Sequence, residues 1–487
     1  MRSGSTSVLL REIVAMKELL FVPAVAVATL VGAAHASDVV MDWNSMYLQG
    51  LRQGPFNGPG PMARTGALMH TAIFNAVNAI DQTHVSYGGF QQVAAPGTSK
   101  KAAVAYAAHR VLTQAYPQPG LVSQFDAQLS SSIAGLSEVE RSLGQALGHA
   151  AADHIIAQRT NDGSSNFITY TPGTNPGDWR PTQAGDPVTP HWGNTTPWGL
   201  NSGSQFRPNR LSSYGTLSNF LASQEYADNY NDVKENGRVD RWTPADEEYQ
   251  IAFFWGNDRG GTYHPPGHLN AITQTMAERQ FAGLSEDDRI SQSARLFGLL
   301  NLAMADAGVA AWDCKYNTEL DLWRPITGIR EADTDGNPLT ISDPAWEPLN
   351  HVDPDGAGPM QADPFSPNFP AYMSGHATFG AAHSAIMREF FGGSDLIEGG
   401  LLEIGTDDPY VPGLTRTFSS WEAMARENGR SRVYLGVHWQ IDADDGYTTG
   451  DSVGQWIFDN YLRAVPTPGA FATFAAAGVF GLRRRRN

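Results

Sequence analysis

The chain has 487 residues, more than one ordinary hydrophobic core accommodates, so we expect two domains or one large composite domain. Its 33 Lys and Arg residues against 50 Asp and Glu residues give a net charge of −17, which repels phosphate backbones and argues against nucleic acid as a partner. The single cysteine, Cys314, excludes an internal disulfide framework and a cysteine-rich zinc site.

The amino terminus has the layout of an export signal. Lys17 precedes an apolar run over residues 19–31, and the small-residue site Ala34-His35-Ala36 follows. This pattern is typical of a secretory signal peptide that is cleaved after Ala36. We therefore predict that residues 1–36 are a signal peptide and that the protein is exported to the periplasm, the cell surface or the medium of a bacterium; the alternative is a buried first helix.

The region that follows is helical up to a long irregular segment. Residues 43–87 repeat apolar side chains at helical spacing, and Ser137 with Glu140 three residues later forms a capping-box signature before another helix. Residues 160–215 are instead rich in Gly, Pro, Asn, Thr and Trp and contain no block of charge. We predict a long ordered loop there, placed to cover a cleft.

The second half of the chain begins with a long core helix. Ser285 and Asp288 form a capping pair, and apolar residues continue at helical spacing through Met304. No run alternates with period two for long enough to predict a sheet, and no repeat of 20 to 50 residues is present. The sequence therefore predicts an almost all-α protein.

Three stretches of the second half carry residues suited to an oxyanion. The first is "CKYNTELDLWRPITGIR", which contains Lys315, Arg324 and Arg330. Pro325 disfavours helical geometry at the residue before it, which places Arg324 where a helix ends. A planar fork of donors at such a boundary suits an oxyanion, although an arginine next to proline is also common at ordinary surfaces.

The second stretch is "FPAYMSGHATFGAAHSAIMREFFGG", in which Ser374, Gly375 and His376 precede a helix that ends at Gly392-Gly393. A hydroxyl and a glycine amide at the start of a helix supply donors with the positive end of the helix dipole behind them. The alternative is that Ser374 is a plain N-cap and His376 an ordinary surface residue.

The third stretch is "SRVYLGVHWQIDADDG", with Arg432, His438 and Asp442. Gly436 weakens a continuous helix between Arg432 and His438, whereas His438 and Asp442 are spaced to meet on one helical face. A carboxylate that fixes one ring nitrogen aims the other at a reacting group, as a nucleophile to phosphorus or as a ligand to a metal. The alternative is a surface salt bridge.

Taken together, the three stretches predict a pocket for a tetrahedral oxyanion. They supply arginines, a lysine, a backbone cradle and two histidines for acid/base and nucleophile or ligand roles. Phosphate as a substrate and vanadate as a cofactor have the same shape and nearly the same charge, so this reasoning leaves both open.

The same residues resemble a known family. The signature Lys…Arg-Pro, Ser-Gly-His and Ser-Arg-x5-His-x3-Asp is similar to that of vanadium-dependent haloperoxidases and type-2 phosphatidic acid phosphatases. The segments "WRPITGIR", "FPAYMSGHATFG" and "SRVYLGVHW" resemble those of the chloroperoxidase branch of the haloperoxidases. The resemblance covers most of residues 40–460. It implies two packed helical bundles of the vanadium chloroperoxidase type, over 37–240 and 241–463, with the site in the second.

The resemblance also implies a role for each site residue. His438 would be the axial ligand of vanadium, oriented by Asp442, His376 the acid/base group, and Phe369 part of the halide pocket. The remaining residues would hold vanadate oxygens or, in the case of the lysine, also polarise peroxide: Lys315, Arg324, Ser374, Gly375 and Arg432. Hydrogen peroxide and halide would be the substrates, hypohalous acid the product, and vanadate the cofactor, with or without an organic acceptor and as a monomer or homo-oligomer.

One spacing departs from that family. Lysine and arginine are usually seven residues apart, but Lys315 and Arg324 are nine apart, which on an uninterrupted helix places them on nearly opposite faces. A bulge or an early helix end would bring the two side chains back to the same face.

Two functions other than that of a haloperoxidase stay open. One is an acid phosphatase with a phosphohistidine intermediate at His438, and the other is a surface protein that keeps the fold without the activity.

The carboxy terminus resembles a sorting tag. Residues 464–487 join a Pro-Thr-Pro-Gly turn, an apolar stretch over 470–482 and four arginines. This layout is similar to the PEP-CTERM tags of exported bacterial proteins, with Pro-Thr-Pro-Gly in place of Pro-Glu-Pro, and implies sorting at a membrane or cell surface. The alternative is a basic, solvated tail.

Overall fold

A computed structural model describes residues 37–182, 185–351 and 366–466 of the chain. The predicted signal peptide, residues 1–36, lies outside the described residues. The apolar and basic parts of the predicted sorting tail, from residue 467 onward, also lie outside them. Both therefore remain predictions from the sequence.

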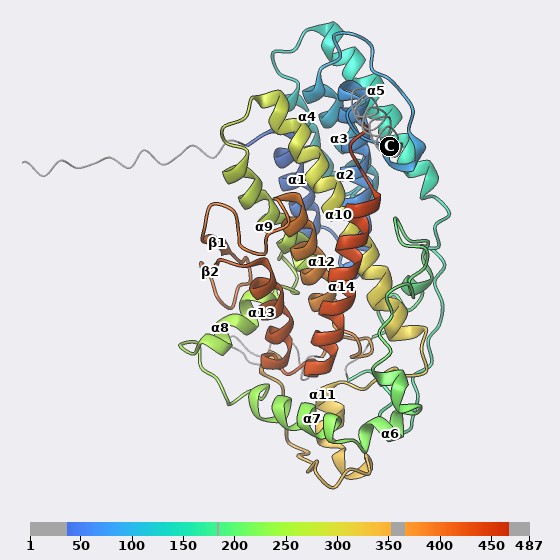
Figure 1. Ribbon diagram of the computed structural model, residues 1–487, viewed down its shortest axis with the longest axis vertical. Helices are drawn as coiled ribbons and strands as arrows, with labels where there is room; N and C mark the ends of the chain where they lie inside the picture. Colours follow the sequence, from blue (N-terminus) through green and yellow to red (C-terminus); the bar gives the residue numbers. More distant parts are fainter. Residues whose placement is uncertain (1–36, 183–184, 352–365, 467–487) are drawn as a thin grey trace, which may run out of the picture. The chain divides into compact units, whose positions relative to one another are not determined.

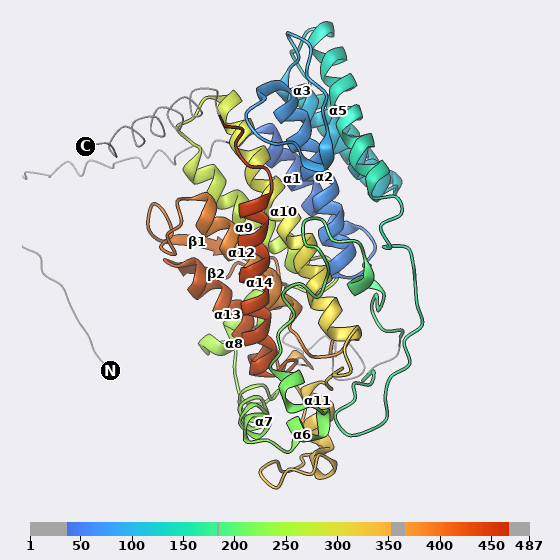
Figure 2. The same cartoon turned by 45° about the vertical axis from the view of Figure 1, so that its right-hand side comes forward.

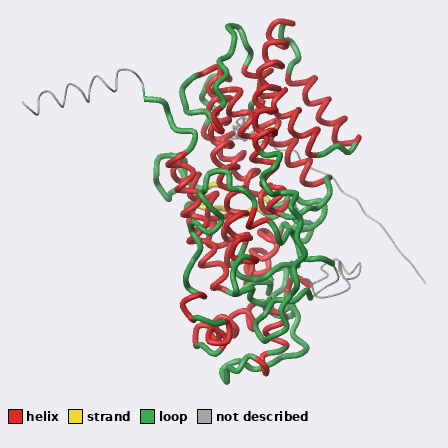
Figure 3. The backbone as a smooth tube through the Cα atoms, turned by 90° about the vertical axis from the view of Figure 1, so that its right-hand side faces the viewer, coloured by secondary structure: helices red, strands yellow, loops and turns green. Residues whose placement is uncertain are grey.

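Helices dominate the described residues, and the all-α prediction is confirmed (Figures 1 and 3). The α-helices are α1 (Val39–Gln53), α2 (Pro59–Asp81), α3 (Lys100–Ala115), α4 (Pro119–Ser132), α5 (Glu138–Gln158), α6 (Leu217–Leu221), α7 (Gln224–Asn236), α8 (Glu247–Gly256), α9 (His264–Gln280), α10 (Glu286–Tyr316), α11 (Pro325–Arg330), α12 (Gly375–Phe390), α13 (Trp421–Tyr434) and α14 (Gln440–Asn460). Single 3₁₀ turns lie at Tyr87–Gly89, Trp192–Asn194, Leu211–Tyr214, Ala332–Thr334 and Leu349–His351. The strands β1 (Leu402–Gly405) and β2 (Thr415–Phe418) pair antiparallel, with Leu402 opposite Phe418.

Helix starts follow the capping signals of the sequence. Ser137 and Glu140 form the expected capping box of α5, and Ser285 caps α10 by accepting a hydrogen bond from the Asp288 amide. Residues 43–87 are mostly helical, as expected, and lie in two helices, α1 and α2, separated between Gln53 and Pro59. The β1–β2 hairpin was not predicted, since strands of four residues are too short to show a period-two pattern.

Helix α10 is the central helix of the core. An 18-residue window of it is apolar enough to cross a membrane by composition, but 94% of that window is buried inside the protein. It packs along α2 from the rings of His70 and Phe297, whose centroids lie 5.0 Å apart, to Gly308, which lies against Gly60. The prediction of a long core helix is thus confirmed, and α10 joins the amino-terminal helices α1–α5 to the helices that follow it (Figure 1).

Helices α12 and α14 pack together most closely. Gly446, Gly450 and Gly454 repeat at one-turn spacing along α14 and face α12. A Cβ at Gly450 would lie 2.2 Å from the carbonyl oxygen of Thr378, a distance that no side chain tolerates. Glycine is therefore required for these two backbones to approach, and their approach sets the start of α12 beside the start of α14.

The segment between α5 and α6 is ordered and irregular where it is described, as predicted. It runs down one side of the helices in Figures 1 and 2. The buried Asp306 of α10 fixes it by accepting backbone N–H bonds of 2.6–2.8 Å from Trp198, Gly199 and Leu200. This segment contributes to the second cavity described below.

Candidate functional site

The predicted site residues come together at the ends of several helices. Lys315 lies in the last turn of α10 and Arg432 in the last turn of α13. Arg324 precedes α11, Ser374-Gly375-His376 begins α12, and His438 and Asp442 lie at the start of α14. A backbone hydrogen bond of 3.0 Å from the Ser374 amide to the Asp442 carbonyl joins the starts of α12 and α14 directly.

His438 and Asp442 make the predicted contact, although not on one helical face. The His438 Nδ1 lies 2.9 Å from Asp442 Oδ2, and both side chains are buried. Because Gly436 takes a positive φ of 73° and ends the α13 turn, His438 lies in the connection before α14. Asp442 also accepts a 3.1 Å hydrogen bond from the Trp439 amide. The same carboxylate therefore caps α14 and orients the His438 ring.

The bonds of His438 determine which of its nitrogens is free to react. Because the Asp442 carboxylate accepts, Nδ1 carries the proton, and Nε2 accepts a 3.0 Å hydrogen bond from Arg324 Nη1. Burial, followed by the positive charges of Arg324 and Lys315, holds the pKa of His438 well below its ordinary value. His438 is therefore neutral at pH 7, and its Nε2 lone pair, which accepts from Arg324 in this structure, can serve a ligand only when that hydrogen bond is displaced.

Arg324 lies at a helix boundary, but at the start of α11 rather than at the end of a helix as predicted. Pro325 is the first residue of α11, where its missing N–H costs no helical hydrogen bond. The buried guanidinium is held by the carbonyl oxygens of Phe369, 2.9 Å away, and Val437, 2.7 Å away. Its Nη2 is buried and has no hydrogen-bond partner among the described residues.

Lys315 reaches the site because α10 ends one residue later, at Tyr316, which is the early helix end that its spacing to Arg324 requires. The fully buried ammonium donates to the carbonyl oxygens of Pro370 and Ala371, at 2.8 and 3.0 Å. Burial and the Arg324 charge lower the pKa of Lys315. An ammonium has three donors, so one remains after these two bonds.

The Ser-Gly-His stretch begins α12 as predicted. The Ser374 hydroxyl accepts a 3.4 Å bond from the Ala377 amide, and the Gly375 amide, in the first position of α12, has no acceptor within its own helix. His376 Nε2 lies 3.3 Å from the Gly256 carbonyl oxygen, which makes Nδ1 its acceptor nitrogen. Burial and the Arg432 charge lower the pKa of His376 to about 3.

Arg432 shows most directly that this site fits an anion. Its side chain is 2% exposed, and none of the described residues accepts a hydrogen bond from its guanidinium. Burial lowers the pKa of Arg432 to about 10 and that of Arg324 to about 9, values at which both remain charged at pH 7. A buried cation without a partner is costly, and a bound oxyanion would supply the missing acceptors.

Gly375, His376, Arg432 and His438 border a small cavity, whereas Lys315, Arg324, Ser374 and Asp442 are not among its lining residues. The cavity is ≈ 10 Å³, about the room for one water molecule, so a four-oxygen anion requires the side chains around it to move apart. Phe369 borders it together with Trp312, their ring centroids 5.0 Å apart. Asp258, just after α8, also lines it, with its Oδ1 3.5 Å from His264 Nδ1; no motif marks Asp258 in the sequence.

Arg330 is not brought to this site, because it donates to the Trp346 carbonyl oxygen instead, at 2.8 Å. Asp445, on the same helix as Asp442, also lies apart from the site and accepts a 2.8 Å bond from the Tyr372 hydroxyl.

Comparisons with known proteins agree with this architecture. The family described as the VCPO second helical-bundle domain matches residues 295–466. Vanadium chloroperoxidase from Curvularia inaequalis is 34% identical over 217 residues, which cover 37% of this chain. The match spans 33% of that chloroperoxidase, about a third of its length.

Solved structures match nearly the whole described chain. A bacterial vanadium-dependent iodoperoxidase gives a TM-score of 0.65 at 22% identity, and a holo-type bacterial vanadium-dependent chloroperoxidase gives 0.62 at 19% identity. Each alignment covers 88% of this chain and 96% of the other. Residues 295–466 are therefore similar to the VCPO second helical-bundle domain, and the fold of the chain is that of bacterial vanadium-dependent haloperoxidases.

Proposed function

We propose that this protein is a vanadate-dependent haloperoxidase that oxidises halide with hydrogen peroxide to hypohalous acid. The observation that carries the proposal is the buried Arg432 guanidinium, whose Nε and Nη1 have no acceptor among the described residues and which borders the same cavity as His438. The similarity of residues 295–466 to vanadium chloroperoxidase supports vanadate rather than phosphate as the anion. Bound vanadate supplies a Lewis acid centre that activates hydrogen peroxide.

Each residue of this chain has a defined task in that reaction. His438 Nε2 would hold the vanadium of bound vanadate, and Asp442 keeps the required tautomer by holding the proton on Nδ1. Arg324 Nη2, the Arg432 guanidinium, the Ser374 hydroxyl and the Gly375 amide bind the oxygens of the anion and balance its charge.

His376 is the acid/base group of the proposal. Its Nε2–H is committed to the Gly256 carbonyl oxygen, so Nδ1 is the nitrogen that takes a proton from hydrogen peroxide and returns it later. A negative charge bound beside it raises the pKa of His376 from its low value without the anion, which brings it toward the range needed for proton transfer.

The halide lies on the aromatic side of the cavity in this proposal. Lys315 Nζ is 4.9 Å and the Arg324 guanidinium carbon 4.8 Å from the centroid of the Phe369 ring, so two basic side chains face this wall. They attract an anionic halide, and the rings of Phe369 and Trp312 exclude water from it. The remaining donor of Lys315 would be available to a bound oxygen of hydrogen peroxide.

The test is bromination of a phenol dye by the purified protein with bromide and hydrogen peroxide, before and after addition of orthovanadate. We expect activity only with vanadate and suppression by phosphate, which competes for the same donors. A protein that instead hydrolyses a phosphate monoester, with vanadate as inhibitor, is a phosphatase that uses His438 as nucleophile. Inactivity in both assays, with no vanadate binding, identifies a surface protein that only keeps the fold.

We also propose that the protein is exported, on the strength of Lys17, the apolar run over 19–31 and the Ala34-His35-Ala36 site. The carboxy-terminal residues 464–487 act in this proposal as a sorting tag at a membrane or cell surface. Amino-terminal sequencing and intact mass of the protein recovered from cell fractions test both parts. A mature chain that begins at Ser37 supports export, and an intact amino terminus in the cytoplasmic fraction contradicts it.

A further inference from the structure

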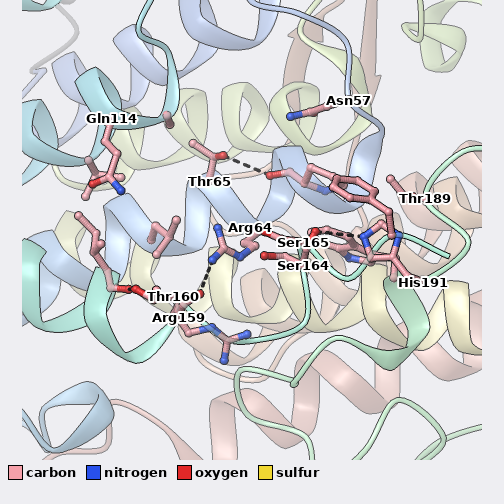
Figure 4. A pocket seen from close by; sticks show the side chains of 17 residues that line it. Asn57, Arg64, Thr65, Gln114, Arg159, Thr160, Ser164, Ser165, Thr189 and His191 are labelled. Atoms are coloured by element: carbon pink, nitrogen blue, oxygen red, sulfur yellow. Dashed lines mark hydrogen bonds between the residues drawn. The ribbon is translucent and has the colours of Figure 1, made fainter.

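A second and much larger cavity lies away from the helix ends of the site. It has a volume of ≈ 460 Å³, within the usual range for small-molecule pockets, and lies between α2, α3, the end of α5 and the segment 164–192 (Figure 4). The residues that line it are Asn57, Pro61, Arg64, Thr65, Leu68, Val111, Gln114, Ala115, Ile156, Arg159, Thr160, Ser164, Ser165, Phe167, Thr189, His191 and Trp192.

The cavity carries an excess of positive charge. Arg64 Nε lies 2.7 Å from Asp162 Oδ2, and its Nη2 donates to the Arg159 carbonyl oxygen at 2.7 Å, while Nη1 has no partner among the described residues. The same Asp162 oxygen also pairs with Arg159 at 3.0 Å, so two guanidinium groups share one carboxylate. No aspartate or glutamate is among the described residues that line the cavity, so Arg64, 20% exposed, can bind an anionic group of a ligand.

The rest of the cavity suits a flat apolar body. One wall is aliphatic, formed by Leu68, Val111, Ala115 and Ile156. Near the Ser164 side, the Phe167 ring is 80% exposed and lies 4.9 Å, centroid to centroid, from the His191 ring. An exposed aromatic side chain at a cavity is costly in water and gains free energy when a ring packs against it.

Two short connections link this cavity to the anion site. Pro59 borders the anion cavity, while Asn57 and Pro61, two residues to either side, border the larger one. Trp312, which lines the anion cavity, donates a 3.1 Å hydrogen bond to the Val188 carbonyl oxygen, next to a residue that lines the larger cavity. A molecule in the larger cavity is thus held close to the place where the proposed product forms.

We propose that this second cavity binds a small aromatic acid, its carboxylate on Arg64 and its ring between the aliphatic wall and Phe167, as the organic acceptor of the halogen. The acceptor role rests on the proposed haloperoxidase function. In the transfer, a ring carbon forms a bond to the halogen of hypohalous acid as the oxygen–halogen bond breaks. The ring loses its proton, and the hydroxide that leaves takes up that proton as water.

The first test is isothermal titration of the purified full chain with 4-hydroxybenzoate, and with the uncharged 4-hydroxybenzyl alcohol for comparison. We expect Arg64→Gln to weaken 4-hydroxybenzoate binding about 10-fold and to leave the alcohol unchanged, because only the carboxylate uses the guanidinium. Arg110→Gln is the matched control, since Arg110 pairs with Asp153 on the exposed face of α3 and does not line the cavity. Equal binding of 4-hydroxybenzoate to wild type and Arg64→Gln contradicts the proposal.

A second variant does not disturb the Asp162 pairs. Ala115→Phe fills the cavity from the end of α3 and is expected to weaken both probes more than 10-fold, whereas Ala157→Phe, on the exposed face of α5, is expected to leave both unchanged. Saturating orthovanadate should leave 4-hydroxybenzoate binding intact; displacement by vanadate would place the probe in the anion site instead and overturn the assignment.

These outcomes separate the two proposals. Binding that depends on Arg64 and Ala115 in a protein without halogenating activity supports the cavity as a site for aromatic acids and rejects only the acceptor role. In an active protein, Arg64→Gln should raise the KM for bromination of 4-hydroxybenzoate and leave kcat for the uncharged alcohol unchanged. An unchanged KM rejects the acceptor role.

Discussion

Two pairs of arginines in this protein differ in whether a carboxylate pairs with them. Arg64 and Arg159 share the carboxylate of Asp162, with Arg159 and Asp162 almost fully buried. Arg324 and Arg432 are as buried or more so, yet neither forms an ion pair with a carboxylate among the described residues, and both keep nitrogens without acceptors.

The contrast between Arg159, which is buried and paired, and Arg432, which is buried and unpaired, distinguishes a structural arginine from one that binds an anion. A buried guanidinium that is paired contributes to the fold, because removal of either partner leaves an uncompensated charge. A buried guanidinium that is unpaired lowers the stability of the protein without a ligand. A bound anion removes this destabilisation, and the difference adds to the affinity for the anion. The site at the helix ends is therefore expected to bind anions at some expense of stability without them.

The largest effect is expected for His438→Ala, which removes the lone pair that faces the anion. We expect vanadate-dependent bromination to fall more than ~100-fold, beyond the loss typical of residues that only support a ligand. His383→Ala is the control, because His383 is equally buried and has no hydrogen-bond partner among the described residues, so packing losses are matched. Comparable losses per folded molecule in both variants would show that His438 serves packing alone.

The arginine comparison is tested by removing one member of each pair. Arg432→Gln should weaken vanadate binding ~100-fold. The free energy of unfolding, measured without vanadate, should not fall, because the substitution removes a buried charge that is unpaired. Arg159→Gln should lower the free energy of unfolding by about 3 kcal/mol and leave vanadate affinity unchanged. Urea unfolding measures the free energy of unfolding and vanadate titration measures the affinity. Loss of stability in Arg432→Gln together with loss of vanadate affinity in Arg159→Gln would contradict the assignment of the two arginines.

A smaller effect is expected for Asp442→Asn, which keeps the shape but removes the charge that holds the proton of His438. Activity should fall ~10–100-fold while the protein stays folded. Asp445→Asn is the control on the same helix, since Asp445 bonds to Tyr372 and pairs with Arg210 rather than with a site residue. Equal activities of the two variants would remove Asp442 from the site.

The smallest effect concerns pH. Burial lowers the pKa of both His376 and His383 to about 3, below the ordinary value of 6.5, so the unfolded chain binds more protons and stability falls as pH drops below 6.5. Each histidine should account for about 1.4 kcal/mol lost by pH 5.5. Saturating phosphate should remove the contribution of His376 to this pH-dependent loss, because an adjacent anion raises its pKa, and should leave the contribution of His383 unchanged. Unfolding curves of the His376→Gln and His383→Gln variants measure the two contributions.

Much of the site could be predicted because its residues lie at helix ends, and helix ends have local signals. The Ser374 cap, the break at Gly436 and the boundary at Pro325 each depend on a few neighbouring residues. Local reasoning misplaced Arg324 at a helix end, because proline after an arginine marks a boundary without giving its direction.

What could not be predicted depends on contacts between distant parts of the chain. Asp258 reaches the cavity from the residues after α8, and neither its neighbours nor its spacing indicates this. The larger cavity forms only when α2, α3 and the segment 164–192 pack together, and the close approach of α12 and α14 at Gly450 likewise depends on tertiary packing. Such placements follow from packing over the whole chain rather than from any short pattern.

Helix α10 has a consequence for how the molecule comes apart. It packs along α2 and its last turn carries Lys315, so the amino-terminal helices and the site are attached to one continuous rod. Neither side can melt without exposing apolar surface of that rod to water. Calorimetry should accordingly show a single cooperative transition, in which loss of the site and loss of the amino-terminal bundle occur at the same temperature.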